Sequence, residues 1–143
     1  MNERNEVLFG GHVGITDGKI VHIAKVPPKE APAEIIDGTG MVLIPGLINC
    51  HTHLATAALR SLCDELSITE SLQQQLQKEA KMDSRIAKAA ATIAAAECLR
   101  FGITSVSDLY YYPDATAEAA AEAGIKGNFA LSAYRFIDQN EEF

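Results

Sequence analysis

The sequence predicts an α/β fold that follows a β-rich N-terminal segment. After residue 46, short apolar runs alternate with helical segments in the order strand, helix, strand, helix, strand. Alternation with helical crossovers implies a parallel sheet. Before that point, residues 7–44 consist of short apolar stretches separated by turns. We therefore expect a β module over residues 1–46 and an α/β module over residues 47–143, in a chain of 143 residues that is long enough to bury a core.

The β module contains a predicted hairpin. Asp17-Gly18 separates the β-branched runs 13–15 and 20–23, and glycine supplies the positive φ of a type I′ turn. Met41 to Ile44 is predicted as a further short strand, because it is an apolar run that Pro45-Gly46 terminates.

The α/β module begins with a predicted strand over residues 47–51. Its uninterrupted apolar character is typical of a strand buried on both faces, with Cys50 turned towards the helices as a small core residue. The later strands are expected at 103–107 and 127–133, the last beginning at about Lys126.

Helices are expected between these strands. Residues 55–82 are polar and helical in character, and a long helix begins at Asp83 or Ser84 and ends near Phe101. A second helix is predicted to start with Asp114 as its cap and to end at Gly124, presenting an alanine face for packing.

Composition excludes several classes of protein. Nineteen acidic against twelve basic residues give a net charge of −7 without a basic patch, so a nucleic-acid partner is not expected. No stretch approaches the roughly 18 apolar residues of a membrane span, and the polar N-terminus lacks a signal-peptide core. Three widely spaced cysteines fit a reduced cytoplasm and exclude a disulfide scaffold.

The motif that carries chemistry is His51-Thr52-His53. Alternate residues of a strand point to the same side, so the two imidazoles lie about 7 Å apart in rise and can close on a divalent transition metal. Histidine pairs also occur in turns and surface strands. Here an apolar strand delivers the pair at its carboxyl end, which matches the active face of a (β/α)8 barrel.

The motif sits in a longer pattern that resembles the amidohydrolase superfamily, within its aminohydrolase and chlorohydrolase branch. The resembling blocks lie at residues 17–20, 36–49, 51–53, 59–62, 97–108 and 122–126. The resemblance implies a partial (β/α)8 TIM-like barrel, made of the first three βα units over residues 47–143. Residues 1–46 would then be part of the small β-sandwich that accompanies such barrels.

The resemblance also implies a metal-dependent hydrolase. His51 and His53 take the role of ligands to one divalent metal, zinc or alternatively iron, which lowers the pKa of a bound water that attacks an sp² carbon. The implied substrate is a purine, pyrimidine or related heterocycle, hydrolysed at a C–N bond by deamination or at a C–Cl bond. Glu79 falls near a glutamate that holds ribose hydroxyls, and Arg135 near an arginine close to the substrate.

Several residues keep two interpretations. Glu79 is equally a solvated helix residue, and Asp108 either lines the active face or acts as a cap or turn residue at a strand end. Tyr110 to Tyr112 form either a substrate wall or, as the residues favour, a packed loop. His12 and His22 are expected to be surface or packing histidines, and Cys63 and Cys98 small core residues.

Length limits the interpretation. A barrel of this kind takes about 250 residues, whereas 90 of the 143 residues follow His53, enough for about three βα units. By the resemblance, the family's remaining metal ligands and its proton-shuttling glutamate have no counterpart in this sequence, and no histidine follows residue 53. We expect the metal site to be incomplete and the isolated chain inactive. The expected partner is either further copies of the chain in a homo-oligomer or a missing C-terminal half. The alternative is a noncatalytic α/β domain that self-associates through its open sheet edge.

Overall fold

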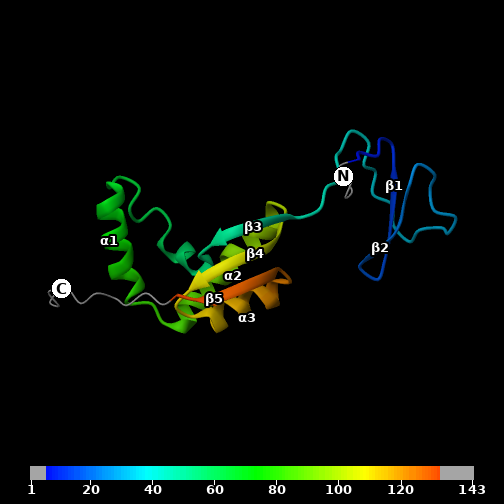
Figure 1. Ribbon diagram of the computed structural model, residues 1–143. Helices are drawn as coiled ribbons and strands as arrows, with labels where there is room; N and C mark the ends of the chain where they lie inside the picture. The colour runs from blue at the N-terminus through cyan, green and yellow to red at the C-terminus, as the bar shows by residue number, and fades with distance from the viewer. Residues whose placement is uncertain (1–5, 133–143) are drawn as a thin grey trace. The chain divides into compact units, whose positions relative to one another are not determined.

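The computed structural model describes residues 6–132, which belong to two compact units, Met1–Pro45 and Gly46–Phe143. Figure 1 shows the order of the elements along the chain. In the described part of the chain, every helix is too short or too polar to cross a bilayer.

The first unit contains the predicted hairpin. Strands β1 (His12–Thr16) and β2 (Lys19–Ala24) pair antiparallel, and the φ angles of Asp17 (51°) and Gly18 (71°) are both positive, as a type I′ turn requires. The prediction of a strand at 41–44 is wrong. Those residues are irregular, because within residues 6–132 no other strand pairs with their backbone. Their apolar side chains are exposed.

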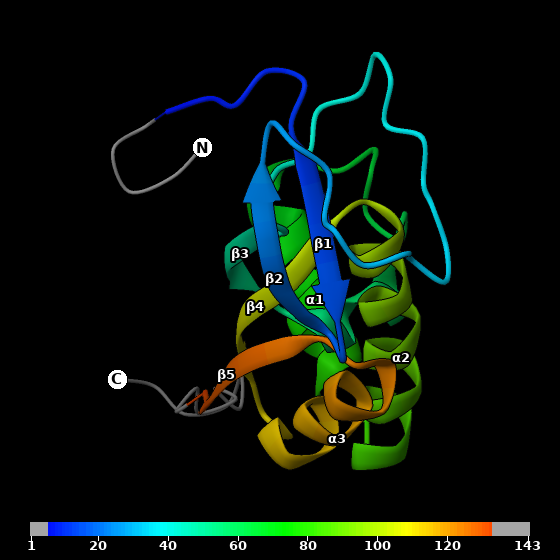
Figure 2. The same cartoon turned by 90° about the vertical axis from the view of Figure 1, so that its right-hand side faces the viewer.

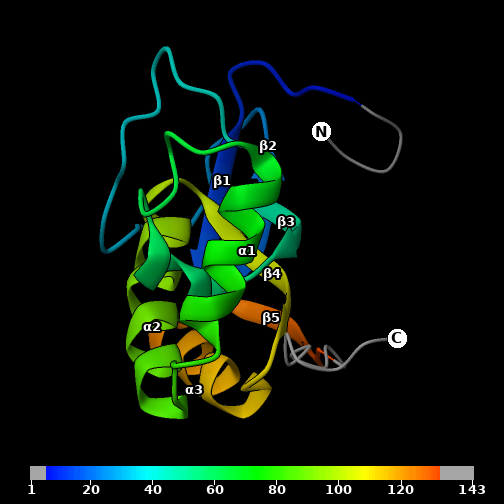
Figure 3. The same cartoon turned by 90° about the vertical axis from the view of Figure 1, so that its left-hand side faces the viewer.

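The second unit is built on a parallel sheet, which confirms the prediction from the alternating pattern. Its strand order is β3 (Leu47–Thr52), β4 (Ile103–Tyr110) and β5 (Lys126–Leu131), so β4 is central. The β3–β4 register places Thr52 opposite Asp108. Helices α2 (Ser84–Arg100) and α3 (Pro113–Ala123) lie together on one face of this sheet, as the views in Figures 1, 2 and 3 agree.

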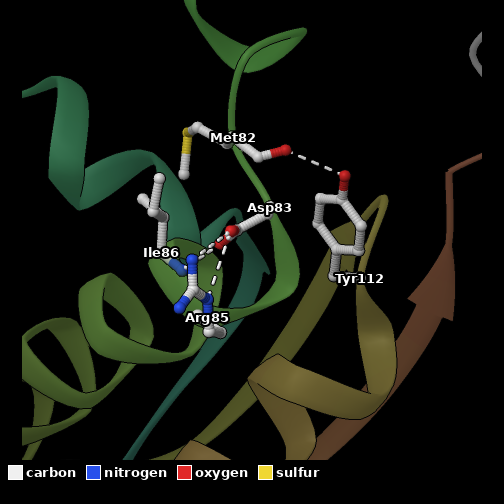
Figure 4. Close-up of polar contacts among 5 residues, drawn as sticks. All are labelled: Met82, Asp83, Arg85, Ile86 and Tyr112. Carbon is white, nitrogen blue, oxygen red and sulfur yellow. Dashed lines mark hydrogen bonds and ion pairs between the residues drawn. The ribbon is translucent and has the colours of Figure 1, made fainter.

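The N-terminus of α2 is capped by Asp83, which resolves the choice between Asp83 and Ser84. The Asp83 carboxylate accepts the Ile86 amide at 2.9 Å and is flanked by the Arg85 guanidinium, 3.2 Å away (Figure 4). These interactions hold the pKa of Asp83 below its usual value, chiefly through the bond from the Ile86 amide. The helix ends before Gly102, whose φ of +80° suits glycine.

The predicted cap of α3 is wrong. The helix begins at Pro113, which is preorganised for the first helical position, and Tyr112 precedes it without capping through its side chain. Asp114 lies inside the first turn, where its charge favours the positive end of the helix. The helix ends as predicted at Gly124, with a φ of +80°, and it buries Ala119 and Ala120 completely.

The polar segment between β3 and α2 forms two helices. A 3-10 helix, η1 (Leu54–Leu59), follows β3 directly. Helix α1 (Ile68–Glu79) starts with a capping box in which Ser67 and Glu70 bond reciprocally. Figures 1 and 3 show α1 beyond the carboxyl ends of the strands.

The core lies between the sheet and its helices and is rich in alanine, so helices approach the strands closely. The cluster between β4, α2 and α3 consists of Leu54, Ala91, Ala95, Val106, Ala119, Ala120 and Ile125. The expectation that β3 is buried on both faces is wrong, because among residues 6–132 the helices cover one face of the sheet and β3 is an edge strand. Ile48 is 68% exposed, and Cys50 is exposed instead of packed against the helices.

Candidate metal centre

His51 and His53 lie at the carboxyl end of β3. His51 belongs to the strand, and His53 follows its last residue and precedes η1. The two ring centroids are 5.0 Å apart and the ring planes are nearly perpendicular, at 84°. His51 is exposed and His53 half-buried, so both rings are accessible at the edge of the sheet where active residues of α/β folds gather.

The orientation of the His53 ring is set by the neighbouring strand. Its Nδ1 lies 2.6 Å from the carbonyl oxygen of Leu109 in β4. A carbonyl can only accept, so Nδ1 carries the proton and Nε2 of the neutral ring keeps a free lone pair. Metal-binding histidines commonly use this arrangement, in which a carbonyl holds one ring nitrogen and frees the other for the metal.

The backbone around His53 is equally constrained. The carbonyl of His53 accepts from both the amide and the hydroxyl of Thr56, at 2.9 and 2.7 Å. The next amide, that of Leu54, donates to the Asp108 carboxylate at 2.7 Å. Both polar groups of the His53–Leu54 peptide therefore have partners.

Asp108 is buried at 2% exposure. Burial raises the pKa of this carboxyl, and the hydrogen bond from the Leu54 amide counteracts that effect only in part. Oδ1 accepts the Leu54 amide, whereas Oδ2 makes no hydrogen bond within the described residues, because the Thr116 hydroxyl donates to the Pro113 carbonyl at 3.1 Å. Asp108 therefore acts inside the fold, as a partner of the backbone beside the histidine pair.

The two imidazoles fit a divalent transition metal as part of its ligand set. Neutral imidazole nitrogens suit zinc and iron, and His53 has the correct nitrogen free. Across residues 6–132, however, no three histidine, cysteine, aspartate or glutamate side chains come together as a metal-binding group. The described residues thus bring together two imidazoles that could serve as ligands, fewer than the three protein ligands of a catalytic zinc site.

Glu79 is buried at the end of α1, at 6% exposure. The interpretation of Glu79 as a solvated helix residue is therefore wrong. Its Oε1 accepts from the Gln75 amide at 3.1 Å. Its charge also reaches Tyr110, whose pKa is raised first by burial and second by Glu79. Glu79 therefore lies near Tyr110, at the carboxyl end of β4, and the histidine pair lies at the carboxyl end of the neighbouring strand β3.

The three tyrosines are packed, as predicted, but Tyr110 is the last residue of β4 and not part of a loop. Tyr110 is 3% exposed and its hydroxyl donates to the Met82 sulfur at 3.4 Å. The Tyr112 hydroxyl donates to the Met82 carbonyl at 2.8 Å (Figure 4). The ring centroids of Tyr110 and Tyr111 are 5.1 Å apart. These contacts connect β4 to the residue before the α2 cap.

The remaining candidates lie elsewhere. Arg135 lies outside the described residues. His12 and His22 belong to the first unit, and His22 Nε2 is 2.8 Å from the Val26 carbonyl oxygen, a local contact that fits a packing role.

An open groove beside His53 was not predicted. It has a volume of about 430 Å³ and is lined by residues of β3, η1 and α2, including Thr52, His53 and Cys98. Arg60 and Glu97 also line it and form a bidentate ion pair, with nitrogen–oxygen distances of 2.8 and 2.5 Å. Arg60 and Glu97 lie in two of the segments that resemble the amidohydrolase superfamily, residues 59–62 and 97–108. That resemblance is the sequence feature that could have indicated this pair.

The parallel sheet carries two accessible histidines at the carboxyl end of its first strand, an arrangement that suits an α/β protein with a metal site. Residues 42–141 match the model of the amidohydrolase family, and the chain belongs to that family.

Named relatives agree with this assignment. The chain is 40% identical over 111 residues to a 5'-deoxyadenosine deaminase of Methanothrix thermoacetophila, covering 77% of this chain and 26% of that protein. It is 38% identical over 135 residues to a 5-methylthioadenosine/S-adenosylhomocysteine deaminase of Thermococcus onnurineus, covering 94% and 31%. The chain therefore spans between a quarter and a third of the length of these relatives.

A solved structure shows the same fold. An atrazine chlorohydrolase mutant of Arthrobacter aurescens, complexed with zinc and atraton, superposes with a TM-score of 0.78 at 29% identity. The match covers 88% of this chain and 32% of that one. The zinc of that complex agrees with a divalent metal in this family.

Proposed function

We propose that the chain supplies the first metal ligands of a hydrolase that deaminates an adenosine-type nucleoside. The observation that carries the proposal is the hydrogen bond from His53 Nδ1 to Leu109, which leaves Nε2 directed for a metal. The family assignment and the deaminases among the relatives support the class of reaction.

His51 and His53 would hold the metal, zinc in the first instance. When bound, the metal supplies Lewis-acid activation of water at neutral pH. The Leu109 carbonyl keeps His53 in one tautomer and increases the basicity of Nε2. Glu79 would accept hydrogen bonds from the sugar hydroxyls of the nucleoside, and Arg135 would lie near the substrate.

The architecture we propose is that of an incomplete barrel. β3, β4 and β5 are the first three strands of a (β/α)8 barrel, and residues 1–46 are part of an accompanying β-sandwich. The support is the parallel order of these strands, with crossover helices on one face, and the likeness to the chlorohydrolase structure. On this proposal, residues outside the 143 supply the other ligands, and the isolated chain has no hydrolase activity.

The test is ammonia release by the intact zinc-loaded protein that contains this chain. We expect 5'-deoxyadenosine and 5-methylthioadenosine to be deaminated, whereas atrazine should release no chloride. His51→Ala should abolish the reaction, and His22→Ala, in the separate N-terminal unit, should leave it unchanged. Chloride release without deamination would contradict the proposed substrate class.

A second candidate is self-association of the 143-residue chain. Apolar side chains on both edge strands favour it, since Ile48 of β3 is 68% exposed and Leu131 of β5 is 66% exposed. Unpaired edges of this kind recruit another sheet. Sedimentation of the isolated chain tests this candidate, and a monomer at micromolar concentration would contradict it.

A further inference from the structure

The carboxylate of Asp108 contacts the backbone next to a proposed metal ligand. Asp108 lies in β4, opposite Thr52 of β3 in the parallel register. From this position its Oδ1 reaches the amide of Leu54, the residue that follows His53, at 2.7 Å. Asp108 thus connects the central strand to the point where β3 gives way to η1.

The Leu54 amide needs this acceptor. Leu54 is 2% exposed, so water does not replace a missing partner easily, and a buried amide without an acceptor is unfavourable. Because Thr56 holds the carbonyl of the same peptide at 2.9 Å, the Asp108 bond completes its orientation. The peptide plane in turn sets the direction in which the His53 side chain leaves the backbone.

Two adjacent residues of β4 therefore control His53 by different routes. The Leu109 carbonyl holds the ring directly, at 2.6 Å from Nδ1, and Asp108 holds the peptide that follows the ring's own residue. Loss of the peptide contact would let the backbone turn and would lengthen the ring contact.

We infer that Asp108 is a positioning residue, which through the Leu54 amide keeps the His53 ring bonded to Leu109 and its Nε2 directed at the metal. The inference rests on the proposed function, and it assigns Asp108 no contact with metal or substrate. The sequence left two interpretations of Asp108 open, a residue lining the active face or a cap at the strand end. The inference favours the second, because the carboxylate accepts a backbone amide at the start of η1.

Two substitutions at Asp108 with side chains of similar shape distinguish the effect of the hydrogen-bond acceptor from the effect of side-chain volume. Asp108→Asn keeps a carbonyl oxygen for the Leu54 amide, whereas Asp108→Leu fills the same space with no acceptor. Val106→Ala, two residues earlier in the same strand and also buried, is the control for a general loss of packing.

The first readout is zinc affinity of the intact protein, measured by competition with a chelator. We expect Asp108→Leu to weaken zinc binding about 10- to 100-fold, the usual loss for an outer partner of a ligand. Asp108→Asn should stay within about threefold of wild type, because it retains the acceptor. Val106→Ala should bind zinc as wild type does in its folded fraction. Equal affinity of Asp108→Leu and wild type would overturn the inference, as would an equal loss in Asp108→Asn.

The second readout needs no metal and no loss-of-function variant. In the zinc-free protein, nitrogen NMR of labelled histidine should show His53 protonated at Nδ1, and the Leu54 amide should exchange slowly with solvent. Asp108→Asn should retain both signatures. A His53 ring protonated at Nε2, or a rapidly exchanging Leu54 amide, would overturn the inference even if Asp108→Leu does not fold.

These outcomes are distinct from a failure of the proposed function. Wild-type protein that binds no zinc would contradict the proposed function, whereas the NMR signatures would still report on the positioning. Zinc binding that is indifferent to Asp108 would contradict only the inference.

Discussion

The Nδ1–H of His53 donates to the main-chain carbonyl of Leu109 across 2.6 Å, and this bond joins the end of β3 to the end of β4. The contact selects one tautomer of the imidazole and leaves Nε2 for a metal. The pairing of β3 with β4 therefore also fixes the orientation of the His53 ring.

Glu79→Gln should alter substrate binding more than turnover. A carboxylate is a stronger hydrogen-bond acceptor for sugar hydroxyls than an amide oxygen. The KM for 5'-deoxyadenosine should therefore rise about tenfold while kcat changes little. The KM for a sugar-free heterocycle should not change. Steady-state kinetics on the intact enzyme make the measurement, with exposed Glu65→Gln as control. An equal rise in KM for both substrates would contradict the assigned role.

Gly46→Ala should destabilise the second unit because of Thr104. A Cβ at residue 46 would overlap the Thr104 side chain, including its immobile Cβ. We expect a loss of about 1–3 kcal/mol in the free energy of unfolding, measured by urea denaturation.

Thr104→Ala removes the atoms that overlap most and provides the control for that prediction. The double variant should recover part of the loss, giving a coupling energy of about 1 kcal/mol between the two positions. Strict additivity of the two single variants would show that the close approach does not matter.

Gly124→Ala should destabilise the end of α3 by about 1 kcal/mol, because Gly124 has a φ of +80° and alanine is strained there. Gly38 is the matched control, since it has no positive φ and a Cβ there meets nothing within 4 Å. Its alanine variant should change the free energy of unfolding by less than about 0.5 kcal/mol. Thermal unfolding of both variants checks the difference, and equal effects would contradict the assigned strain.

The Arg60–Glu97 ion pair should be detectable in an acid titration as a lowered pKa of Glu97. The hydrogen bonds and charge of Arg60 hold the pKa of Glu97 below its usual 4.5. The pair therefore adds stability above the unfolded-state pKa, and that stability is lost as the pH falls through the lower, folded-state pKa. Carbon NMR of the Glu97 carboxyl should show its pKa rising in Arg60→Ala and unchanged in Arg85→Ala. An unchanged Glu97 pKa in Arg60→Ala would mean that the pair does not persist in solution.

The sequence predicts the pattern of strands and helices well but predicts burial poorly. Alternating segments and turn glycines act locally, so β1, β2, both ends of α2 and the C-terminal end of α3 agree with their signals. Burial of β3 depends on what covers the sheet, and a local pattern carries no information on that. Cys50 is exposed for the same reason.

The candidate site divides in a similar way. The histidine pair is visible as a motif, but the partner of His53 lies 56 residues away and is a main-chain oxygen. Any residue at position 109 would supply that oxygen, so no side-chain signal marks it. The sequence shows Asp108 as an acid at a strand end, whereas its contact with the Leu54 amide follows from the pairing of β3 with β4.

The most direct test of the account is the zinc affinity of His53→Asn in the intact protein. Asparagine can keep the donor to Leu109 but has no nitrogen at the position of Nε2, so the fold should be retained while zinc affinity falls at least about 100-fold. Circular dichroism and chelator competition measure the two properties. Stoichiometric zinc binding by the wild type, lost in the folded variant, is the result we predict. Zinc binding of equal strength in His53→Asn would contradict the assignment of His53 as a metal ligand.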